Sequence, residues 1–411
     1  MRTRGRPPGR IGNSRSFGRS RVGKVPRLAK MPAIQEDIHA CTMCGYCVPV
    51  CPAYQEAGWE GASPRGRVFA LRQYEMRGPL DLFLRRDVKP GEEFARNSWE
   101  CTGCGACTEV CPVDIPFDTV WDDVKAWMVA SGYERPQLAP YLENVRQTHN
   151  LYGEPTDKRG AWIPPEAVQS EHPEVLYWVG CAASYKRQQI ARAMVKILNA
   201  AKVPYQILGP EEWCTGAPLA RMGYQEVTKK ELMPHNVQAV EETGAKVLVT
   251  ACAECYRAFA RDYRQWGGNP PYSVFHISHY VEKLIREKRI AFTKPLPQKV
   301  AFHDACHMSR VAKVYDAPRQ ALKFIRDLKV LEIAPHHEDA LCSGAGGGFP
   351  AVFPEQAVGV AQRRLDAAED TGAPSVVTTC PHAELHFEDV TSKRNMTLSI
   401  VDLAEMLANA L

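Results

Sequence analysis

The sequence predicts a multidomain α+β protein, in which a helical N-terminal domain is followed by two copies of one α/β module. Two observations indicate this division. Eight of the fifteen cysteines lie in two short runs, at residues 41–51 and 101–111, and the other seven belong to a repeat that reaches almost to the C-terminus. Within the repeat, apolar strand-like runs alternate with helix-like stretches of about 10 to 20 residues, which is typical of parallel sheets.

The first thirty residues form a basic arm. They contain eight arginines and two lysines but no acidic residue, and they are rich in Gly, Ser and Pro. Such a segment is expected to be disordered, and it lacks the apolar stretch of a secretory signal. Two interpretations stay open: a solvated arm, or an upstream start codon with Met31 as the true first residue. The rest of the chain carries a net charge of −6, against +4 for the whole, and no nucleic-acid partner is expected.

Both cysteine runs read C-x2-C-x2-C-x3-C-P. This spacing binds cubane [4Fe–4S] clusters in two-cluster ferredoxins. The two-residue gaps let three thiolates surround one corner of a cluster, while the fourth cysteine, turned away by its proline, reaches the other cluster. The two ligand sets are therefore expected to cross, one being Cys41, Cys44, Cys47 and Cys111 and the other Cys101, Cys104, Cys107 and Cys51.

The 49 residues between the two runs exceed what a compact ferredoxin needs. Residues 64–76 and 91–100 are expected to be helical, with an apolar stripe at Val68, Leu71 and Tyr74. The sequence thus predicts a helical ferredoxin domain over residues 31–165, with two [4Fe–4S] clusters set between its helices.

Location follows from the same cysteines and from hydropathy. No stretch approaches the length of about 18 consecutive apolar residues that indicates a membrane span. Thiols that ligate iron must stay reduced, which favours the cytoplasm over an oxidising compartment. We therefore expect a cytoplasmic protein that reaches the inner face of the membrane, if at all, through a partner subunit.

The seven remaining cysteines define an internal repeat. Residues 242–252 align with residues 370–380 at an offset of 128, and residues 214–216 match residues 342–344 at the same offset. Such self-similarity indicates duplication, with copies over residues 166–292 and 293–411. Strands are expected near 175–180, 203–208, 246–251, 298–303, 329–333 and 375–379, and helices near 185–201, 225–243, 316–326 and 354–371. The cysteines follow strand ends, where parallel sheets place their sites.

The cysteine spacing of the repeat resembles a known module. Cys181 is followed after 32 residues by Cys214-Thr215, and after a further 36 residues by the C-x2-C pair of Cys252 and Cys255. This resembles the CCG module of heterodisulfide reductase-type iron–sulfur proteins, in which one Cys precedes an adjacent Cys-Cys-Gly and then C-x2-C. Residues 58–67 resemble a segment of the D-type subunit of heterodisulfide reductase, with related segments in sulfite-reduction-complex and glycolate oxidase iron–sulfur subunits. Residues 303–307 and 342–348 resemble this family too.

The first copy departs from the family pattern at one position. The family's five cysteines per module hold a noncubane cluster at which disulfides are cleaved, but the second cysteine of the adjacent pair is here Thr215. Four thiolates suffice for a cubane cluster, so we expect a third cluster in this copy, the alternative being a vestigial module with buried cysteines. Its expected ligands are Cys181, Cys214, Cys252 and Cys255.

The second copy departs further. Ser343 replaces the second cysteine of the pair, and Ala383 stands where the last cysteine is expected. Three thiolates hold a cluster only with help from a histidine or from Ser343, or with one iron left open to substrate. The alternatives are a further cluster or a structural lobe. Candidates for a catalytic role are Cys306, His307, Cys342, Cys380 and His382.

The resemblance implies an iron–sulfur electron-transfer subunit of a heterodisulfide-reductase-like oxidoreductase complex. Its implied partners are a flavoprotein, a membrane cytochrome b-type subunit, or both. No dinucleotide-binding fingerprint appears, so a flavin or nicotinamide would belong to another subunit. Two alternatives stay open: a catalytic thiol or disulfide reductase acting at a CCG-module cluster, and the iron–sulfur subunit of a flavin-dependent glycolate- or lactate-type dehydrogenase. The glycine-rich stretch 344–348 lacks the Lys of a P-loop and is expected to let the backbone approach a cluster.

Overall fold

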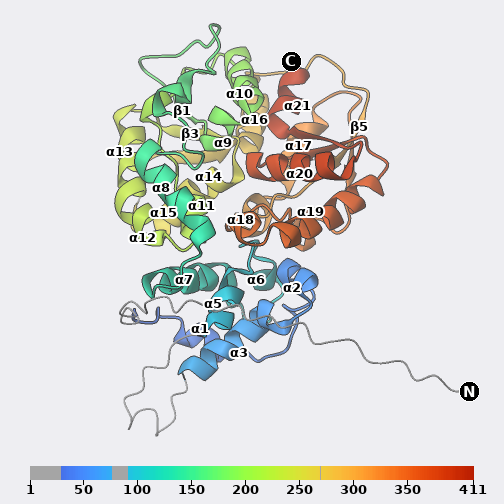
Figure 1. Cartoon of the computed structure of the whole chain (residues 1–411). Coiled ribbons are helices and arrows are strands. Elements are labelled where there is room, and N and C mark those ends of the chain that lie inside the picture. Colours follow the sequence, from blue (N-terminus) through green and yellow to red (C-terminus); the bar gives the residue numbers. More distant parts are fainter. Residues whose placement is uncertain (1–28, 76–90, 269) are drawn as a thin grey trace, which may run out of the picture.

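A computed structural model describes residues 29–75, 91–268 and 270–411. The basic arm expected over residues 1–30 lies outside the described residues except for its last two, and Met76, the expected end of one helix, lies outside them too. Figure 1 shows most of the helical domain, up to about residue 130, in blue and cyan below two α/β modules that lie side by side, the first in green and yellow and the second in orange and red. Helix α8 (Ala139–Thr148) lies higher, against the first module.

The N-terminal domain is helical. The two helices expected between the cysteine runs are confirmed as α3 (Pro64–Glu75) and α5 (Glu92–Trp99). On α3, Val68 and Leu71 are fully buried, and Tyr74 packs edge-on against Trp127 of α7, so the expected stripe does face the core. The other helices of this region are α1 (Gln35–Ala40), α2 (Pro52–Ala57), α6 (Ala106–Glu109), α7 (Phe117–Ala130) and α8 (Ala139–Thr148).

The first module contains a four-stranded, fully parallel sheet in the order β2-β1-β3-β4. Three of its strands were predicted: β1 (Val175–Trp178), β2 (Tyr205–Gln206) and β3 (Val247–Thr250). The edge strand β4 (Ser273–His276) was not. The central strands are apolar on both faces because helices cover both sides of the sheet. These helices are α9 (Cys181–Tyr185), α10 (Gln188–Ala200), α11 (Ala217–Arg221), α12 (Gln225–Val227), α13 (Met233–Glu242), α14 (Ala253–Arg257), α15 (Tyr263–Gln265) and α16 (Ile277–Arg286).

The second module repeats this arrangement, with the strand order β6-β5-β7-β8 and parallel pairing throughout. The equivalent order confirms the duplication. Its strands are β5 (Lys299–Phe302), β6 (Lys329–Glu332), β7 (Ser375–Thr378) and β8 (Ser399–Asp402), the last again an edge strand that was not predicted. Its helices are α17 (Asp316–Lys323), α18 (Phe349–Val352), α19 (Pro354–Glu369), α20 (Pro381–Arg394) and α21 (Leu403–Asn409).

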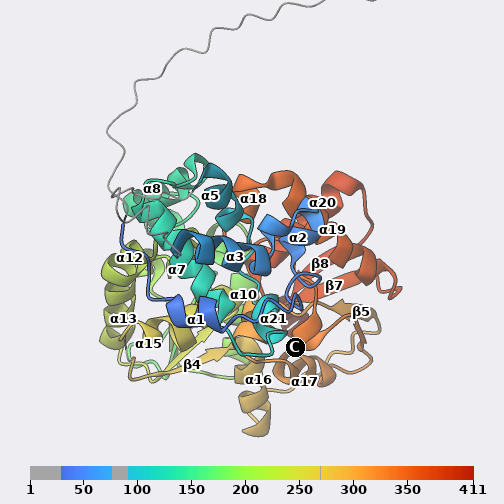
Figure 2. The same cartoon turned by 90° about the horizontal axis from the view of Figure 1, so that it is seen from below.

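The two modules share one hydrophobic core. Helix α10 of the first packs against α21 of the second, and α16 packs against α17. Val300, Leu407 and other second-module residues lie in the same buried cluster as Val175 and Ile190 of the first. Seen from below in Figure 2, the helical domain spans the junction, with α7 against α11 of the first module and α2 against α19 of the second. Across the described ranges, no helix is both long and apolar enough to cross a membrane.

Candidate iron–sulfur centres

The first predicted ligand set lines one cavity at the surface of the helical domain. Its four thiols, together with Arg65 and Tyr46, form the walls. Cys44 is exposed, and the backbone amide of Tyr46 donates a hydrogen bond that lowers the pKa of the Cys44 thiol. Burial raises the pKa of Cys47, on the inner wall, to about 11. A cluster held here would therefore lie close to solvent on one side. The four thiols are Cys41, Cys44, Cys47 and Cys111.

Three thiols of the second predicted set, Cys51, Cys104 and Cys107, are buried, and the fourth, Cys101, is half-buried. Burial raises the pKa of Cys51 to about 11, with smaller contributions from the neighbouring Cys101 and Cys104. Burial and the thiols of Cys104, Cys101 and Cys51 raise the pKa of Cys107 well above its usual range. These mutual effects place the four thiols together. In the metal-free chain Cys51, Cys104 and Cys107 are protonated at neutral pH, so binding a cluster there would release protons.

Backbone amides around the thiols suit an iron–sulfur cluster. The same Cys-x-Gly turn occurs three times, and in each the glycine N–H donates to the cysteine sulfur: Gly103 to Cys101 at 3.4 Å, Gly216 to Cys214 at 3.3 Å and Gly344 to Cys342 at 3.3 Å. Such N–H···S hydrogen bonds stabilise sulfur ligands and tune cluster potentials. The donor set thus fits the expected cofactor.

In the first module, four thiols meet at the carboxyl edge of the sheet. Cys181 contacts Cys214, Cys255 contacts Cys252, and Cys255 lies beside the first pair. A hydrogen bond with Cys214 and the charge of Arg159 lower the pKa of Cys181 to about 6 against the effect of burial. Both terminal nitrogens of Arg159 lie 3.7 Å from this sulfur. The third expected centre therefore has its four thiols together, with a buried cation beside them.

The three thiols of the second module are not brought together. Cys306 and Cys342 contact each other, but Cys380 hydrogen-bonds Cys252 of the first module instead. The reason is that the segments after β3 and β7 meet across the junction, where the Ala253 N–H donates to the Thr379 carbonyl at 3.2 Å. Cys380 therefore joins the thiols of the first module.

The two candidate histidines converge on Glu254, between the modules. His382 Nδ1 lies 2.8 Å from Glu254 Oε2, and His307 Nδ1 lies 3.5 Å from Oε1. Burial opposes ionisation of Glu254, but His382 and His307 lower its pKa to about 2. Burial would lower the pKa of His382, but Glu254 raises it to about 9. Burial and Arg257 lower the pKa of His307 to about 3. At neutral pH Glu254 and His382 thus form an ion pair beside a neutral His307.

A cavity of about 270 Å³ opens beside this ion pair. Glu254 and His382 form its polar wall, and most of its remaining surface is apolar, with contributions from Tyr152, Met222 and Leu385. Tyr152 lies close enough to Cys181 and Cys252 for their charges to raise its pKa, in addition to the larger effect of burial. Tyr152 therefore lies between the cavity and the thiol group of the first module.

Buried cations surround the second ferredoxin set. The Arg67 guanidinium, 1% exposed, donates to the carbonyls of Ala62, Asn97 and Glu100 and lies near Cys51. Lys125 Nζ donates to the Cys101 carbonyl at 3.0 Å and to the Arg221 carbonyl at 3.1 Å. These charges would offset the negative charge of a cluster with four thiolate ligands.

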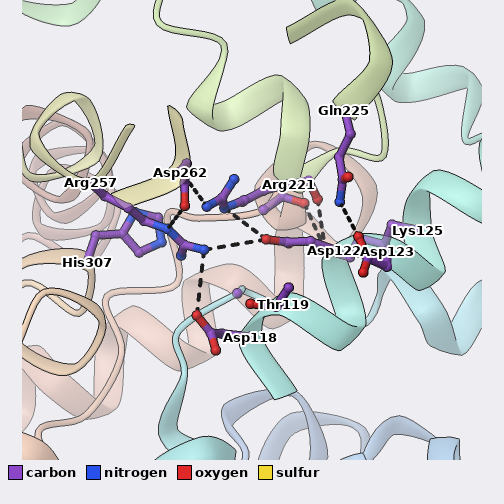
Figure 3. A network of polar contacts seen from close by, with 12 residues as sticks. Asp118, Thr119, Asp122, Asp123, Lys125, Arg221, Gln225, Arg257, Asp262 and His307 are labelled. Carbon is purple, nitrogen blue, oxygen red and sulfur yellow. Dashed lines mark hydrogen bonds and ion pairs between the residues drawn. The ribbon is translucent and has the colours of Figure 1, made fainter. Parts of the chain in front are cut away.

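A buried ion network joins the helical domain to the first module (Figure 3). Asp118 and Asp122 come from α7, whereas Arg221, Arg257 and Asp262 come from the module. Arg221 lies 3.2 Å from Asp122 and 2.5 Å from Asp262. Arg257 lies 3.3 Å from Asp262, 3.5 Å from Asp122 and 3.7 Å from Asp118. Because each charge has an opposite neighbour, the network holds α7 rigidly against the module.

Comparison with known proteins places these sites in a family. Residues 37–115 match the 4Fe-4S dicluster domain, and residues 175–260 and 300–388 each match the cysteine-rich CCG domain. The D-type subunit of the dihydromethanophenazine:CoB–CoM heterodisulfide reductase of Methanosarcina barkeri is 34% identical over 387 residues, which cover 91% of this chain and 94% of the relative. The chain belongs to the family of this D-type heterodisulfide reductase subunit. It is accordingly an iron–sulfur protein of an oxidoreductase family.

More distant members of this group are longer. The EtfAB:quinone oxidoreductase of Syntrophomonas wolfei is 28% identical over 91% of this chain but only 58% of its own length. The probable iron–sulfur-binding oxidoreductase FadF of Bacillus subtilis is 26% identical, with 60% of its length covered. A solved structure of a hypothetical Helicobacter pylori protein covers 84% of this chain and 76% of its own at a TM-score of 0.53 and 10% identity, a likeness of fold alone.

Several residues around the sites escaped the sequence analysis. Glu254 lies between the ligand candidates Cys252 and Cys255. An acidic residue between two candidate ligands could have been recognised from the sequence as a candidate site residue. Arg159 and Lys125 gave no such signal, because Arg159 lies 22 residues before Cys181 and Lys125 lies 24 residues after Cys101. The glycine-rich stretch, which was expected to let the backbone approach a cluster, packs against the ferredoxin loop: a Cβ on Gly346 would lie 2.5 Å from the Thr102 carbonyl.

Proposed function

We propose that this chain is the iron–sulfur electron-transfer subunit of a heterodisulfide-reductase-like complex, relaying electrons between a redox partner and a site in the cysteine-rich modules. The observation that carries this proposal is the continuity of thiol groups from the surface inward. The surface set reaches the buried set through Cys47, which neighbours Cys51 and Cys107. The buried set reaches the second module through Cys104, which hydrogen-bonds Cys342. A cluster in each ferredoxin set would supply one-electron transfer.

The partners are proposed to be a flavoprotein, a membrane cytochrome b-type subunit, or both. The relatives from heterodisulfide reductase and the EtfAB:quinone oxidoreductase support assembly with other redox subunits. The exposed surface set supports an entry point there, since Tyr46 and Val113 on its cavity wall are 63% and 40% exposed. The complex is proposed to lie in the cytoplasm, at the inner face of the membrane where a membrane subunit is its partner.

A catalytic thiol or disulfide reductase is the second candidate. The cavity at the Glu254–His382 pair favours it, because this space is large enough for a small substrate and its wall residue Tyr152 lies near the first module's thiols. In that case Glu254 and His382 would bind and orient the substrate. A third cluster on Cys181, Cys214, Cys252 and Cys255 would supply the electrons.

Iron and acid-labile sulfide per chain, measured with EPR on anaerobically purified protein, test the proposal. We expect at least about eight irons, the content of two cubane clusters. Cys44→Ser should remove the signal of the surface cluster, and Cys107→Ser that of the buried one. Met43→Leu, in the wall of the surface cavity, is the matched control and should keep both. A wild-type content near four irons, or an unchanged spectrum in both serine variants, would refute the relay.

The same samples test the third centre. A content of about twelve irons, with a signal lost in Cys181→Ala, would locate a cluster in the first module. A content of about eight irons, with only ferredoxin-type signals, would mean that the cysteine-rich modules hold no cluster. The protein would then transfer electrons through its ferredoxin clusters alone, and the reductase alternative would be excluded.

A further inference from the structure

The thiols of Cys306 and Cys342 form an isolated pair beside the buried ferredoxin set. The two pack in one cluster with Cys104, and each thiol lies close enough to its neighbour to affect its pKa, Cys306 with Cys342 and Cys342 with Cys104. Cys342 Sγ lies 3.5 Å from Thr102 Oγ1 of the ferredoxin loop. All three sulfurs pack in one buried cluster with Cys51. The second module therefore places two adjacent thiols within contact of a proposed cluster ligand.

The pair lacks the partners that a cluster of its own would need. In the first module, Cys255 contacts Cys252 and lies beside Cys181 and Cys214. The equivalent of Cys255 in the second module is Ala383. The third thiol, Cys380, contacts Cys252 of the first module across the junction. With two sulfurs left, the pair has the composition of a dithiol rather than of a cubane site.

Their surroundings suit a reactive pair. Arg310, 2% exposed, donates through Nε to the Cys104 carbonyl at 2.8 Å, and its Nη2 has no hydrogen-bond partner among the described residues. The charges of Cys104, Cys306 and Cys342 raise the pKa of Arg310 against the effect of burial, so the guanidinium lies near all three sulfurs. It would therefore stabilise negative charge that develops on a sulfur when the pair gains an electron.

Solvent can reach the pair through a cavity of about 310 Å³ between the helical domain and the second module. Cys342, Cys104 and Arg310 line it, together with Arg363 and the carboxylates of Glu338 and Asp339. A space of this size admits water and small reagents. Protons can thus be delivered to Cys342 when the pair is reduced.

We propose that Cys306 and Cys342 are a redox-active dithiol–disulfide pair that exchanges electrons with the buried ferredoxin cluster. This rests on the proposed function, because it takes Cys104 as a cluster ligand. In reduction, the Cys306–Cys342 sulfur–sulfur bond breaks, two electrons arrive one at a time from the cluster, and two protons arrive from the cavity, giving two thiols. In oxidation, the two thiols lose two protons and two electrons to the cluster and the bond forms again. The pair thereby links one-electron cluster chemistry to a two-electron store.

Thiol trapping at a controlled redox potential tests the pair directly. The anaerobic holoprotein is equilibrated with mixtures of reduced and oxidised dithiothreitol, alkylated with N-ethylmaleimide, and mapped by mass spectrometry. We expect a peptide linked through Cys306 and Cys342 under oxidising mixtures, lost reversibly under reducing ones. Ser343→Ala, beside Cys342, is the matched control and should keep the linked peptide, whereas Cys306→Ser should lose it with its iron content unchanged. The proposal would be overturned if no Cys306–Cys342 disulfide formed at any redox potential, or if Cys306→Ser lost about four irons per chain.

Electron exchange needs a second readout. In a stoichiometric reductive titration followed by EPR, protein whose pair starts as a disulfide should take up two more electrons per chain before the signal of the buried cluster is complete than protein whose pair starts as a dithiol. Cys306→Ser should need no extra electrons, and equal titrations for the two starting states of the wild type would overturn the coupling. Failure of the proposed function is distinguishable, because it appears as an iron content below about eight, independently of whether the disulfide forms.

Discussion

Replacing Arg257 by methionine tests whether the network of Figure 3 fixes the helical domain on the first module. The guanidinium is 2% exposed and lies within 3.3 to 3.7 Å of three carboxylates, those of Asp262, Asp122 and Asp118. Methionine keeps the apolar stem but removes the charge, so two arginines are left for three carboxylates. Because an unbalanced charge remains buried, we expect the free energy of unfolding to fall by about 3–5 kcal/mol.

Two further variants test whether this loss of stability comes from the unbalanced buried charge. Arg261→Met removes a cation that is 26% exposed and lies 2.7 Å from Asp118 alone, and Asp118 keeps Arg257 at 3.7 Å, so its cost should be clearly smaller than that of Arg257→Met. In Arg257→Met/Asp262→Leu, Asp118 keeps Arg261 and Asp122 keeps Arg221, which restores the charge balance. We expect the double variant to recover part of the lost stability.

Urea denaturation of the anaerobic holoprotein, followed by tryptophan fluorescence, measures these changes at constant slope. Hydrogen exchange of the α7 amides reports whether α7, which carries Asp118 and Asp122, loses protection in Arg257→Met. The reasoning is refuted if Arg257→Met costs no more than Arg261→Met, or if the double variant is less stable than Arg257→Met alone.

Three further predictions concern the core, the glycine loop and pH. Leu407→Ala, in the fully buried core shared by both modules, should cost about 2–5 kcal/mol in urea titrations; a cost below about 1 kcal/mol would contradict a shared core. Gly346→Ala should cost about 1–3 kcal/mol, because its Cβ would lie 2.5 Å from a backbone carbonyl, whereas Gly91→Ala, with open space around it, should be near neutral. Burial and Glu405 raise the pKa of Glu384 from 4.5 to about 8. The folded state thus binds a proton that the unfolded state releases, and stability is lost as pH rises from 4.5 to 8. Glu384→Gln should flatten that pH profile and stabilise the protein at pH 8 by about 1 kcal/mol or more; an unchanged profile would show that Glu384 keeps its ordinary pKa.

The local features of the fold were readable from the sequence. The apolar stripe between the two cysteine runs predicted the helical domain, and the two helices expected there are α3 and α5. The duplicated strand–helix pattern predicted six of the eight strands that the described residues form. Four of these six, the central strands β1, β3, β5 and β7, are mostly buried apolar runs, which have no polar alternation to obscure them. The two strands that were missed, β4 and β8, are edge strands whose residues are less uniformly apolar.

The sequence by itself determined which thiols group within each run and within the first module, because these groupings depend on spacings of a few residues and on strand ends. Only the tertiary structure decided that Cys380 joins Cys252, that Cys342 contacts Cys104, and that Arg310 lies beside both Cys104 and Cys342. The physical reason is that these contacts join residues from distant parts of the chain. They depend on how the helical domain and the two modules dock, which local spacing does not encode.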